Sequence, residues 1–260
     1  MVDSFHKVRA RTPNKMKIMN DLQHQEECSA CPSRSANFFC NLPEDALSAF
    51  NSIKIMHSYP RGTTLFAEGQ PANGVYILCA GRVKLSTYSE GGKAIIIRIT
   101  QAGEILGLSA SISGVVHEAT AQVVEACQVN FVRRDEFLTF LSENSDAALN
   151  ALLELSRNYH QAHRQICSLG LSDSAGDKLA KLFLDWYDRS DDEGAGVRIP
   201  MLFTHEEIAE MIGSSRETVT RLLKYFTDRK LISVNRTGLH IPDRRKLEAA
   251  IGQRHRPRVT

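Results

Sequence analysis

The feature that most constrains this chain is the stretch FTHEEIAEMIGSSRETVTRLLKYF near its C-terminus. Thr204 and Glu207 stand three residues apart and predict a capping box, in which each side chain accepts the other residue's backbone N–H, so a helix begins there. Gly213 ends that helix, because glycine readily takes the left-handed conformation of a helix C-terminus. Ser214 and Glu217 predict a second capping box and a second helix. Two short helices joined by a tight turn predict a helix-turn-helix.

The second helix separates apolar and polar residues onto opposite sides. Its expected buried side consists of Val219, Leu222, Leu223 and Phe226. Arginine can bond guanine O6 and N7 together and glutamate can accept from cytosine N4, whereas hydroxyls and helix N-termini hold phosphates. We therefore predict DNA contacts from eight residues: Thr204, Ser214, Ser215, Arg216, Glu217, Thr220, Arg221 and Lys224. The next segment, LISVNRTGLHIP, predicts a hairpin wing that brings Arg236 and His240 near the DNA backbone.

A heptad pattern precedes the helix-turn-helix. Its apolar residues alternate in spacing between four and three, and polar residues lie between them. They are Ala148, Leu152, Leu155, Tyr159, Ala162, Ile166 and Leu169. This spacing predicts one long helix over residues 145–170, whose narrow apolar seam pairs with the same helix of a second subunit. The alternative interpretation is that the stripe packs on the chain's own N-terminal domain.

Residues 53–134 carry short segments rich in β-branched and aromatic residues. They read GTTLFAEG, GVYILCAGRVKLSTY, KAIIIRIT and ATAQVVEACQVNFV, with glycines between them. The step YSEGGK predicts a hairpin turn, because glycine tolerates the positive φ of tight hairpins. Many short strands separated by turns predict a small barrel or jelly roll.

Composition and charge narrow the class of protein. The chain is 42% hydrophobic and has no long apolar run, so we expect no membrane span and no secretory signal, and place it in the cytoplasm. Residues 197–260 hold 13 Lys/Arg against 7 Asp/Glu, a net charge of +6, whereas the whole chain carries +2. A basic C-terminal part predicts an anionic partner, nucleic acid first. Without a nucleophile elbow or a phosphate-binding glycine loop, we do not expect an enzyme.

The order of barrel, long helix, helix-turn-helix and wing resembles the Crp/Fnr family of bacterial transcription regulators. The strongest match is THEEIAEMIGSSRETVTRLLKYFTDRKLI, and PRGTTLFAEGQPANGVYILCAGRVKL is similar to the family's barrel. The resemblance implies an α+β fold in five parts. These are a flexible cysteine-containing segment (1–37), a double-stranded β-helix or jelly-roll barrel (38–144), a dimerisation helix (145–170), a winged helix-turn-helix (171–250) and a basic tail (251–260).

The resemblance also implies partners. A homodimer would read a palindromic double-stranded DNA site, with Arg216, Glu217 and Arg221 as base readers and Thr220 as an auxiliary residue. Its half-sites would lie about one helical turn apart, roughly 34 Å. RNA polymerase is a further partner that the resemblance implies.

An effector site in the barrel follows from the same resemblance. Cyclic-nucleotide-binding members hold the ribose with a Glu and the phosphate with an Arg-Ser/Thr pair. In GEILGLSASISGVVHEATA, Leu108 stands at the Glu position and His117-Glu118 at the Arg-Ser/Thr position. A carboxylate there repels a phosphate, so we expect a pocket at Gly107, Leu108, His117 and Glu118 for an unknown small effector other than cyclic AMP or cyclic GMP. For His117 itself, an exposed loop position is favoured over a place in the pocket.

Three of the six cysteines form the pattern Cys28-x2-Cys31-x8-Cys40. A C-x2-C turn can aim two thiolates at one iron or zinc ion. Oxygen-sensing members that resemble Fnr hold a [4Fe–4S] cluster through three N-terminal cysteines and one barrel cysteine. The resemblance nominates Cys127 as that fourth ligand, on the same strand face as Asn130, where the family's barrel cysteine falls.

The remaining cysteines are expected to have structural roles. Cys79 is expected in the core and Cys167 in the helix seam. A metal site, a metal-free thiol redox switch and purely structural thiols therefore remain three open alternatives for the N-terminal trio.

The leading functional hypothesis is a homodimeric, sequence-specific DNA-binding regulator that senses an effector or redox signal. The alternative, from a different class, is a small-molecule or redox-sensing module whose helix-turn-helix makes only protein contacts. Steep salt dependence of binding distinguishes the two, because DNA binding releases counterions from the phosphates.

Overall fold

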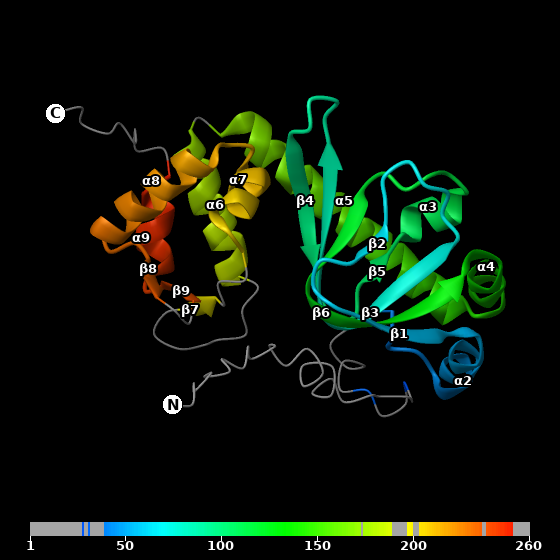
Figure 1. Ribbon diagram of the computed structural model, residues 1–260. Helices are drawn as coiled ribbons and strands as arrows, with labels where there is room; N and C mark the ends of the chain where they lie inside the picture. The colour runs from blue at the N-terminus through cyan, green and yellow to red at the C-terminus, as the bar shows by residue number, and fades with distance from the viewer. Residues whose placement is uncertain are drawn as a thin grey trace, which may run out of the picture.

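The computed structural model describes Cys28, Cys31 and residues 39–172, 174–188, 197–199, 203–235 and 238–251. An antiparallel barrel and a helical domain with a small sheet are joined by one long helix (Figure 1). The rest of the predicted N-terminal segment, the tail beyond Ile251 and the predicted wing residue Arg236 lie outside the described residues.

The barrel begins after a short helix, α2 (Glu44–Ile53). Its strands are β1 (Ile55–Tyr59), β2 (Thr64–Phe66), β3 (Gly74–Tyr88), β4 (Ala94–Thr100), β5 (Ile105–Leu106) and β6 (Thr120–Arg133). Helix α3 (Leu108–Ser113) precedes β6, and α4 (Arg134–Glu143) follows it. The sheet order is β1-β6-β3-β4, with β2 added to β6 and β5 added to β3. This arrangement confirms the predicted barrel.

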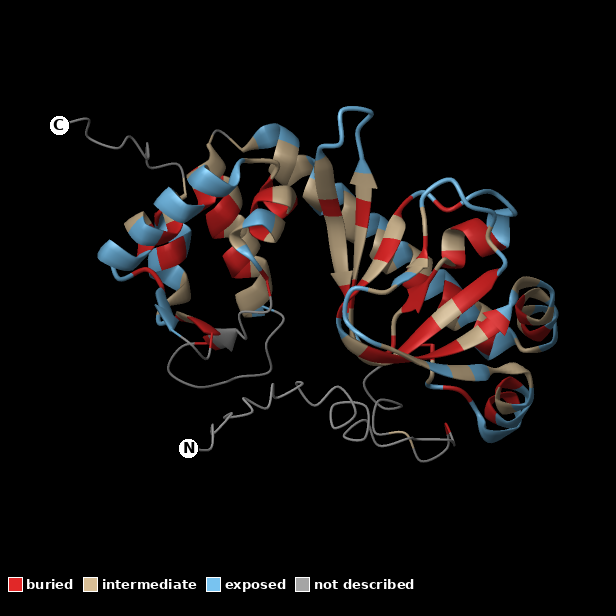
Figure 2. Cartoon of the chain, viewed as in Figure 1, coloured by how far each residue is buried: buried red, intermediate tan, exposed pale blue. Residues whose placement is uncertain are grey.

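Strands β3 and β6 are the central pair of the barrel sheet. They pair antiparallel from Gly74 opposite Arg133 to Ser86 opposite Thr120. Their inward side chains are fully buried, and Figure 2 shows this buried band along the strands, with exposed residues at the tip of the β3–β4 hairpin. The predicted turn is present at that tip, where the Ser89 N–H donates to the Lys93 carbonyl at 3.0 Å.

Aromatic residues close one end of the barrel. Phe39 lies 5.8 Å from Phe50 and 5.9 Å from Phe137, ring centre to ring centre, so α2 and α4 are bound together over the sheet. Edge and tilted aromatic pairs contribute about 0.5–1.5 kcal/mol each beyond the area they bury. Phe39 is fully buried, which anchors the chain directly before Cys40.

Helix α5 (Ser145–Leu171) agrees with the heptad prediction to within one residue at its end. The elements after it are α6 (Ala175–Asp188), β7 (Val197–Ile199), α7 (His205–Ile212), α8 (Arg216–Asp228), β8 (Ser233–Asn235), β9 (Gly238–Ile241) and α9 (Arg244–Ala249). Strands β8 and β9 form the predicted wing hairpin. Strand β7 joins this hairpin by pairing with β9, Val197 opposite Ile241 and Ile199 opposite Leu239.

The C-terminal domain has a compact apolar core of its own. Phe183 of α6 and Phe226 of α8 are fully buried and meet edge to face at 6.4 Å. Ile208 of α7 and Leu239 of β9 are also fully buried. The apolar faces predicted for both helices of the helix-turn-helix therefore define how α6, α7, α8 and the wing pack. In the part of the chain that the structure describes, no helix is long and apolar enough to cross a membrane.

Two glycines at positive φ provide a matched test of strand packing. Gly81 has a φ of 84°, and a Cβ there would lie 2.3 Å from the Ala126 carbonyl oxygen on β6. Gly62 has a φ of 91°, but a Cβ there would meet nothing within 4 Å. We expect Gly62→Ala to lower the free energy of unfolding by about 1–2 kcal/mol through backbone strain alone. Gly81→Ala should cost about 1–3 kcal/mol more, because it also overpacks the sheet. Urea unfolding measures both, and equal losses would contradict the packing argument.

Candidate DNA interface and effector sites

The first helix of the helix-turn-helix begins at the predicted capping box. The Thr204 hydroxyl accepts from the Glu207 N–H at 3.2 Å, and the Glu207 carboxylate accepts from the Thr204 N–H at 2.9 Å. Gly213 ends the helix with a left-handed φ of 61°. The prediction of a second box at Ser214 was wrong by one residue. The Ser214 N–H closes the preceding turn on the Ala209 carbonyl, and the N-cap of α8 is Ser215, whose hydroxyl accepts from the Thr218 N–H.

The polar side of α8 is open to solvent. The predicted DNA-contact residues divide by exposure: Ser214 is half-buried, whereas Thr204, Ser215, Arg216, Glu217, Thr220, Arg221 and Lys224 are exposed. Behind them, Val219, Leu223 and Phe226 are buried in the domain core, and Leu222 is half-buried. A rigid helix thus presents guanidinium, carboxylate and hydroxyl groups on one face, which is the arrangement that a major-groove reader needs.

Local hydrogen bonds order this face. The Ser215 hydroxyl and the backbone N–H of Glu217 itself hold the pKa of the Glu217 carboxyl below its usual range, the backbone N–H having the larger effect. Glu217 is therefore an anionic acceptor at neutral pH. The Thr220 hydroxyl lies 2.9 Å from His205 Nδ1 and also donates to the Arg216 carbonyl. His205, in the first turn of α7, belongs to this polar face although the sequence argument did not single it out.

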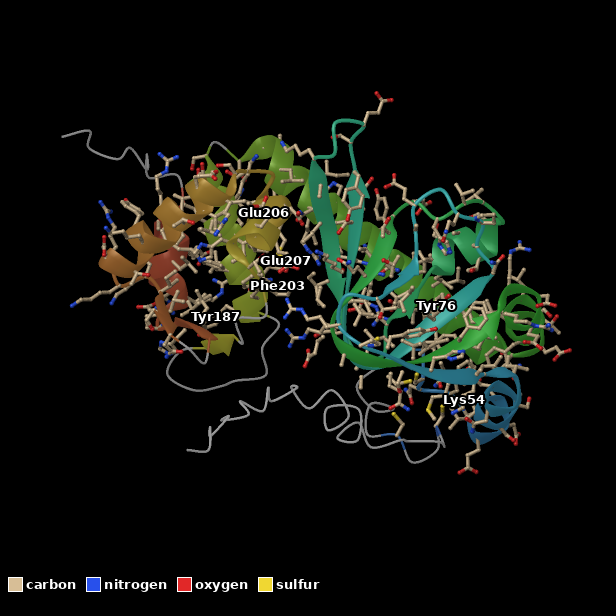
Figure 3. All side chains as sticks on the ribbon, in the orientation of Figure 1. Lys54, Tyr76, Tyr187, Phe203, Glu206 and Glu207 are labelled. Atoms are coloured by element: carbon tan, nitrogen blue, oxygen red, sulfur yellow. The ribbon has the colours of Figure 1, made fainter. Side chains whose placement is uncertain are left out.

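The helix-turn-helix also contacts the barrel. The Lys84 ammonium of β3 lies 3.2 Å from a Glu207 carboxylate oxygen, and both side chains are largely buried. Figure 3 shows Glu207 on the side of α7 that faces the barrel. Burial alone would raise the pKa of Glu207, but hydrogen bonds from Thr204 and Lys84 and the positive charge of Lys84 lower it overall. The same carboxylate thus caps α7 and ties it to the effector domain.

A second link runs through α5. The Gln165 amide nitrogen donates to the Met211 carbonyl of α7 at 2.7 Å and to the Ile96 carbonyl of β4 at 3.5 Å. One side chain of the long helix therefore bonds both domains. A cavity of about 540 Å³ lies beside this link, between β4, α5, α6 and α7.

The predicted effector pocket is a cavity of about 320 Å³ between the barrel and α5. Gly107, Leu108, His117 and Glu118 all line it, so the structure brings the four predicted residues together. Leu155, Tyr159 and Ala162 of α5 form part of its wall. An effector in this cavity would therefore touch the long helix directly.

The favoured exposed position for His117 was wrong. Its ring stacks on Phe66 at 3.8 Å, the side chain is buried, and burial lowers its pKa. The neighbouring chain holds the loop inward, because the His117 N–H donates to the Gln70 carbonyl and its own carbonyl accepts from the Gly69 N–H, each at 2.8 Å. A neutral imidazole in this wall suits an uncharged ligand better than an anion.

The charges around the pocket are already balanced or unfavourable to phosphate. The Arg98 guanidinium lies 2.6 Å from the Glu104 carboxylate, and its side chain is nearly buried. The Glu118 carboxylate lines the cavity and accepts from the Ser109 hydroxyl at 3.4 Å. A cyclic phosphate would have to break the first ion pair and approach a second carboxylate.

The predicted seam of α5 divides between two sides of the helix. Leu152, Tyr159 and Ile166 are 62%, 68% and 69% exposed. Ala148, Leu155, Ala162 and Leu169 are half-buried instead. Leu155 packs against the barrel core, and Leu169 lies against the turn at Gly213. The two rows of a heptad lie on adjacent sides of a helix, and the chain's own domains cover one of them.

The structure places Cys127 away from the N-terminal cysteines, so the expected strand face shared with Asn130 was wrong. Cys127 lies three residues before Asn130, so the two side chains point to opposite faces of β6. Cys127 is fully buried in the apolar cluster inside the barrel, opposite Tyr59 of β1. Burial raises the pKa of its thiol to about 11, and no other cysteine contributes to that shift.

Cys79 of β3, rather than Cys127, lies beside Asn130. The Asn130 Nδ2 donates to Cys79 Sγ at 3.2 Å and to Cys28 Sγ at 3.7 Å. Burial, followed by repulsion from Cys28 and Cys31, raises the pKa of the Cys79 thiol to about 12. Cys79 was expected to be an ordinary core residue. No local pattern indicates that it shares a hydrogen-bond donor with Cys28, because the two cysteines are far apart in the chain and are brought together through Asn130.

Cys40 belongs to the same group of thiols. Burial, followed by repulsion from Cys79, Cys28 and Cys31, raises its pKa to about 12. Among the described residues, no three Cys, His, Asp or Glu side chains are already arranged to hold a metal ion. The four cysteines are neighbours whose sulfurs would have to draw together around a metal. Four thiols are the donor set that zinc and iron–sulfur clusters select, so the residues fit such a group in kind.

Comparisons with known proteins match both domains. Residues 56–144 match the cyclic nucleotide-binding domain family, and residues 177–250 match the Crp-like helix-turn-helix domain family. A CRP-like cAMP-activated global transcriptional regulator of Mycobacterium tuberculosis is 26% identical over 213 residues, which cover 82% of this chain and 95% of the relative. A global nitrogen regulator of Nostoc sp. is 28% identical over 189 residues, covering 72% and 85%.

Solved structures share the fold. A mutant of CooA from Carboxydothermus hydrogenoformans superimposes with a TM-score of 0.68 at 20% identity, covering 82% of this chain and 94% of that one. FixK2 from Bradyrhizobium japonicum superimposes with a TM-score of 0.66 at 20% identity, covering 76% and 96%.

Fold and matches together define a transcription regulator in which a cyclic nucleotide-binding-type barrel is joined to a DNA-binding helix-turn-helix. The chain belongs to the Crp/Fnr family of transcription regulators. Both relatives are named as regulators and not as enzymes.

Proposed function

We propose that this protein is a homodimeric, sequence-specific DNA-binding regulator whose affinity for DNA is controlled from the barrel. The observation that carries the proposal is the open polar face of α8, where Arg216, Glu217 and Arg221 stand exposed on a helix whose opposite side is buried. The family match supports DNA as the partner. A protein acting on DNA in this way would work in the cytoplasm, with RNA polymerase as a further partner.

The dimer is supported by the exposed apolar row of α5. Leu152, Tyr159 and Ile166 recur at seven-residue intervals, and the exposed Leu149 and Leu153 widen the row. Isolated exposed leucines are common, but a row at heptad spacing predicts a partner helix. A two-fold pair of α5 helices would place two α8 helices for a palindromic site.

The signal would reach DNA through α5. This helix lines the effector cavity with Leu155, Tyr159 and Ala162, and its Gln165 bonds both β4 and α7. A small, largely uncharged effector in the cavity would change the packing of α5 and thereby the position of α7 and α8. Coupling of this kind requires only that the effector bind one arrangement more tightly than the other.

A second candidate signal is iron or redox state, sensed by the N-terminal cysteines as in Fnr-like regulators. The specific observation in its favour is that the Cys31 N–H donates to the Cys28 carbonyl and that Cys40 packs against the apolar cluster that contains Cys28. The sensing part would then adjoin α2 and the barrel, while DNA reading stays with α8.

Removing the base readers tests the DNA-binding proposal. We expect Arg216→Ala and Arg221→Ala each to weaken binding to an operator selected from random DNA by about 1–3 kcal/mol per half-site, because each removes a bidentate contact to a base. Arg61→Ala on the barrel loses the same charge at an exposed position and should bind normally. Gel shifts at several salt concentrations measure affinity and the steep salt slope. Equal binding to all sequences, unaffected by either substitution, would favour the alternative in which the helix-turn-helix contacts only proteins.

The oligomeric state tests the seam. Ile166→Glu places a charge in the proposed helix pair and should convert the dimer to monomer, since burying an unpaired carboxylate costs several kcal/mol. Ile55→Glu changes a half-exposed residue of β1 in the same way and should leave the dimer intact. Sedimentation velocity distinguishes the two. A wild-type monomer, or dissociation by both variants, would refute this interface.

Calorimetric titration with cyclic AMP tests the nature of the effector. We expect no saturable heat at millimolar nucleotide, because Arg98 is paired with Glu104 and Glu118 repels the phosphate. Micromolar binding that is lost on His117→Ala would overturn this expectation and return the pocket to the cyclic-nucleotide class.

A further inference from the structure

Four cysteines from three separate segments lie near one another beside the barrel, although no three of their sulfurs are arranged around a metal position in the described residues. Cys28 and Cys31 are joined by a turn in which the Cys31 N–H donates to the Cys28 carbonyl at 3.3 Å. Cys40 comes next in the chain, just before α2, and Cys79 lies on β3. Because Cys28 and Cys79 accept hydrogen bonds from the same nitrogen of Asn130, their sulfurs are no farther apart than the sum of those two distances.

Two polar side chains, Lys54 and Asn130, donate hydrogen bonds to the sulfurs of Cys28 and Cys79 in otherwise apolar surroundings. The Lys54 ammonium donates to Cys28 Sγ at 3.0 Å, and Figure 3 shows sulfur atoms beside the labelled Lys54. Asn130 is 3% exposed, and its Oδ1 accepts no hydrogen bond from the described residues. A buried amide and an ammonium directed at neutral thiols gain little, whereas N–H donors to thiolate sulfurs stabilise and tune a metal centre.

We propose that Cys79 of β3 is the fourth protein ligand of a thiolate metal centre that it forms with Cys28, Cys31 and Cys40. This inference rests on the second candidate signal and assigns its ligands. Cys127 has no part in it, because that thiol lies inside the barrel. A four-thiolate set selects zinc or an iron–sulfur cluster, and either would tie the N-terminal segment to α2 and β3.

The assignment places the sensor next to the domain-linking strand. Cys79 and Lys84 lie on the same strand, and Lys84 bonds Glu207 of the helix-turn-helix. Gain or loss of the metal would alter β3 at Cys79, a short distance along the strand from Lys84, which holds α7. This route differs from the effector cavity, whose wall is formed with α5.

The two barrel cysteines provide a matched pair for the experiment. The full-length wild type, Cys79→Ser and Cys127→Ser are purified without oxygen and reconstituted either with ferrous iron and sulfide or with zinc alone. In whichever reconstitution loads the wild type, we expect Cys127→Ser to bind the metal as tightly as the wild type does. Cys79→Ser should lose at least about tenfold in metal affinity. Visible charge-transfer absorbance and metal analysis show which metal the protein has bound. Circular dichroism confirms that each variant is folded.

A second measurement needs no variant. Alkylation followed by mass spectrometry, on metal-loaded and chelator-treated wild type, should show protection of Cys28, Cys31, Cys40 and Cys79 by metal and no metal-dependent change at Cys127. Loss of metal by Cys127→Ser with retention by Cys79→Ser would overturn this ligand assignment alone. A wild type that takes up metal in neither arm, including one that forms disulfides in air, would overturn the metal site altogether. Neither result bears on DNA binding, which the Arg216 and Arg221 variants test separately.

Discussion

One long helix has to satisfy two domains at once, and the rest of the molecule is arranged around that requirement. The inner side of α5 packs on the barrel through Leu155 and reaches the helix-turn-helix through Leu169. Between these points Gln165 bonds backbone carbonyls of both domains. The outer side is left with exposed leucine, tyrosine and isoleucine at heptad spacing. The helix therefore packs one face against its own chain and leaves the other face exposed.

Glu207 shows how a local signal can acquire a second role. In the sequence it is half of a capping box, which requires only Thr204 three residues earlier. In the folded chain its carboxylate also meets Lys84, which lies 123 residues away. Displacing Lys84 would disturb the N-terminus of α7, since the shared carboxylate would lose one of its partners. Contact with the barrel and capping of α7 thus depend on a single side chain.

Local patterns predicted the helices and the barrel well, because capping, glycine turns and heptad spacing depend on neighbours within a few residues. Each wrong prediction has a physical cause in the folded chain. Ser215 replaced Ser214 as the N-cap because Ser214 closes the preceding helix. His117 proved buried because a distant ring, Phe66, stacks on it. The seam residues divided between two surfaces because the chain's own domains cover one row of the heptad.

The sequence by itself determined that two capped helices expose a polar face of the kind that reads DNA. It also determined that a long helix precedes them and that a barrel of short strands separated by glycines comes first. Those features follow from backbone hydrogen bonds and periodic burial over short distances. Only the tertiary structure decided which cysteines are neighbours. Strand β6 turns Cys127 inward, whereas β3 presents Cys79 to Asn130 and Cys28. Strand pairing sets the face and register of each side chain, and pairing between segments far apart leaves no mark on the local sequence.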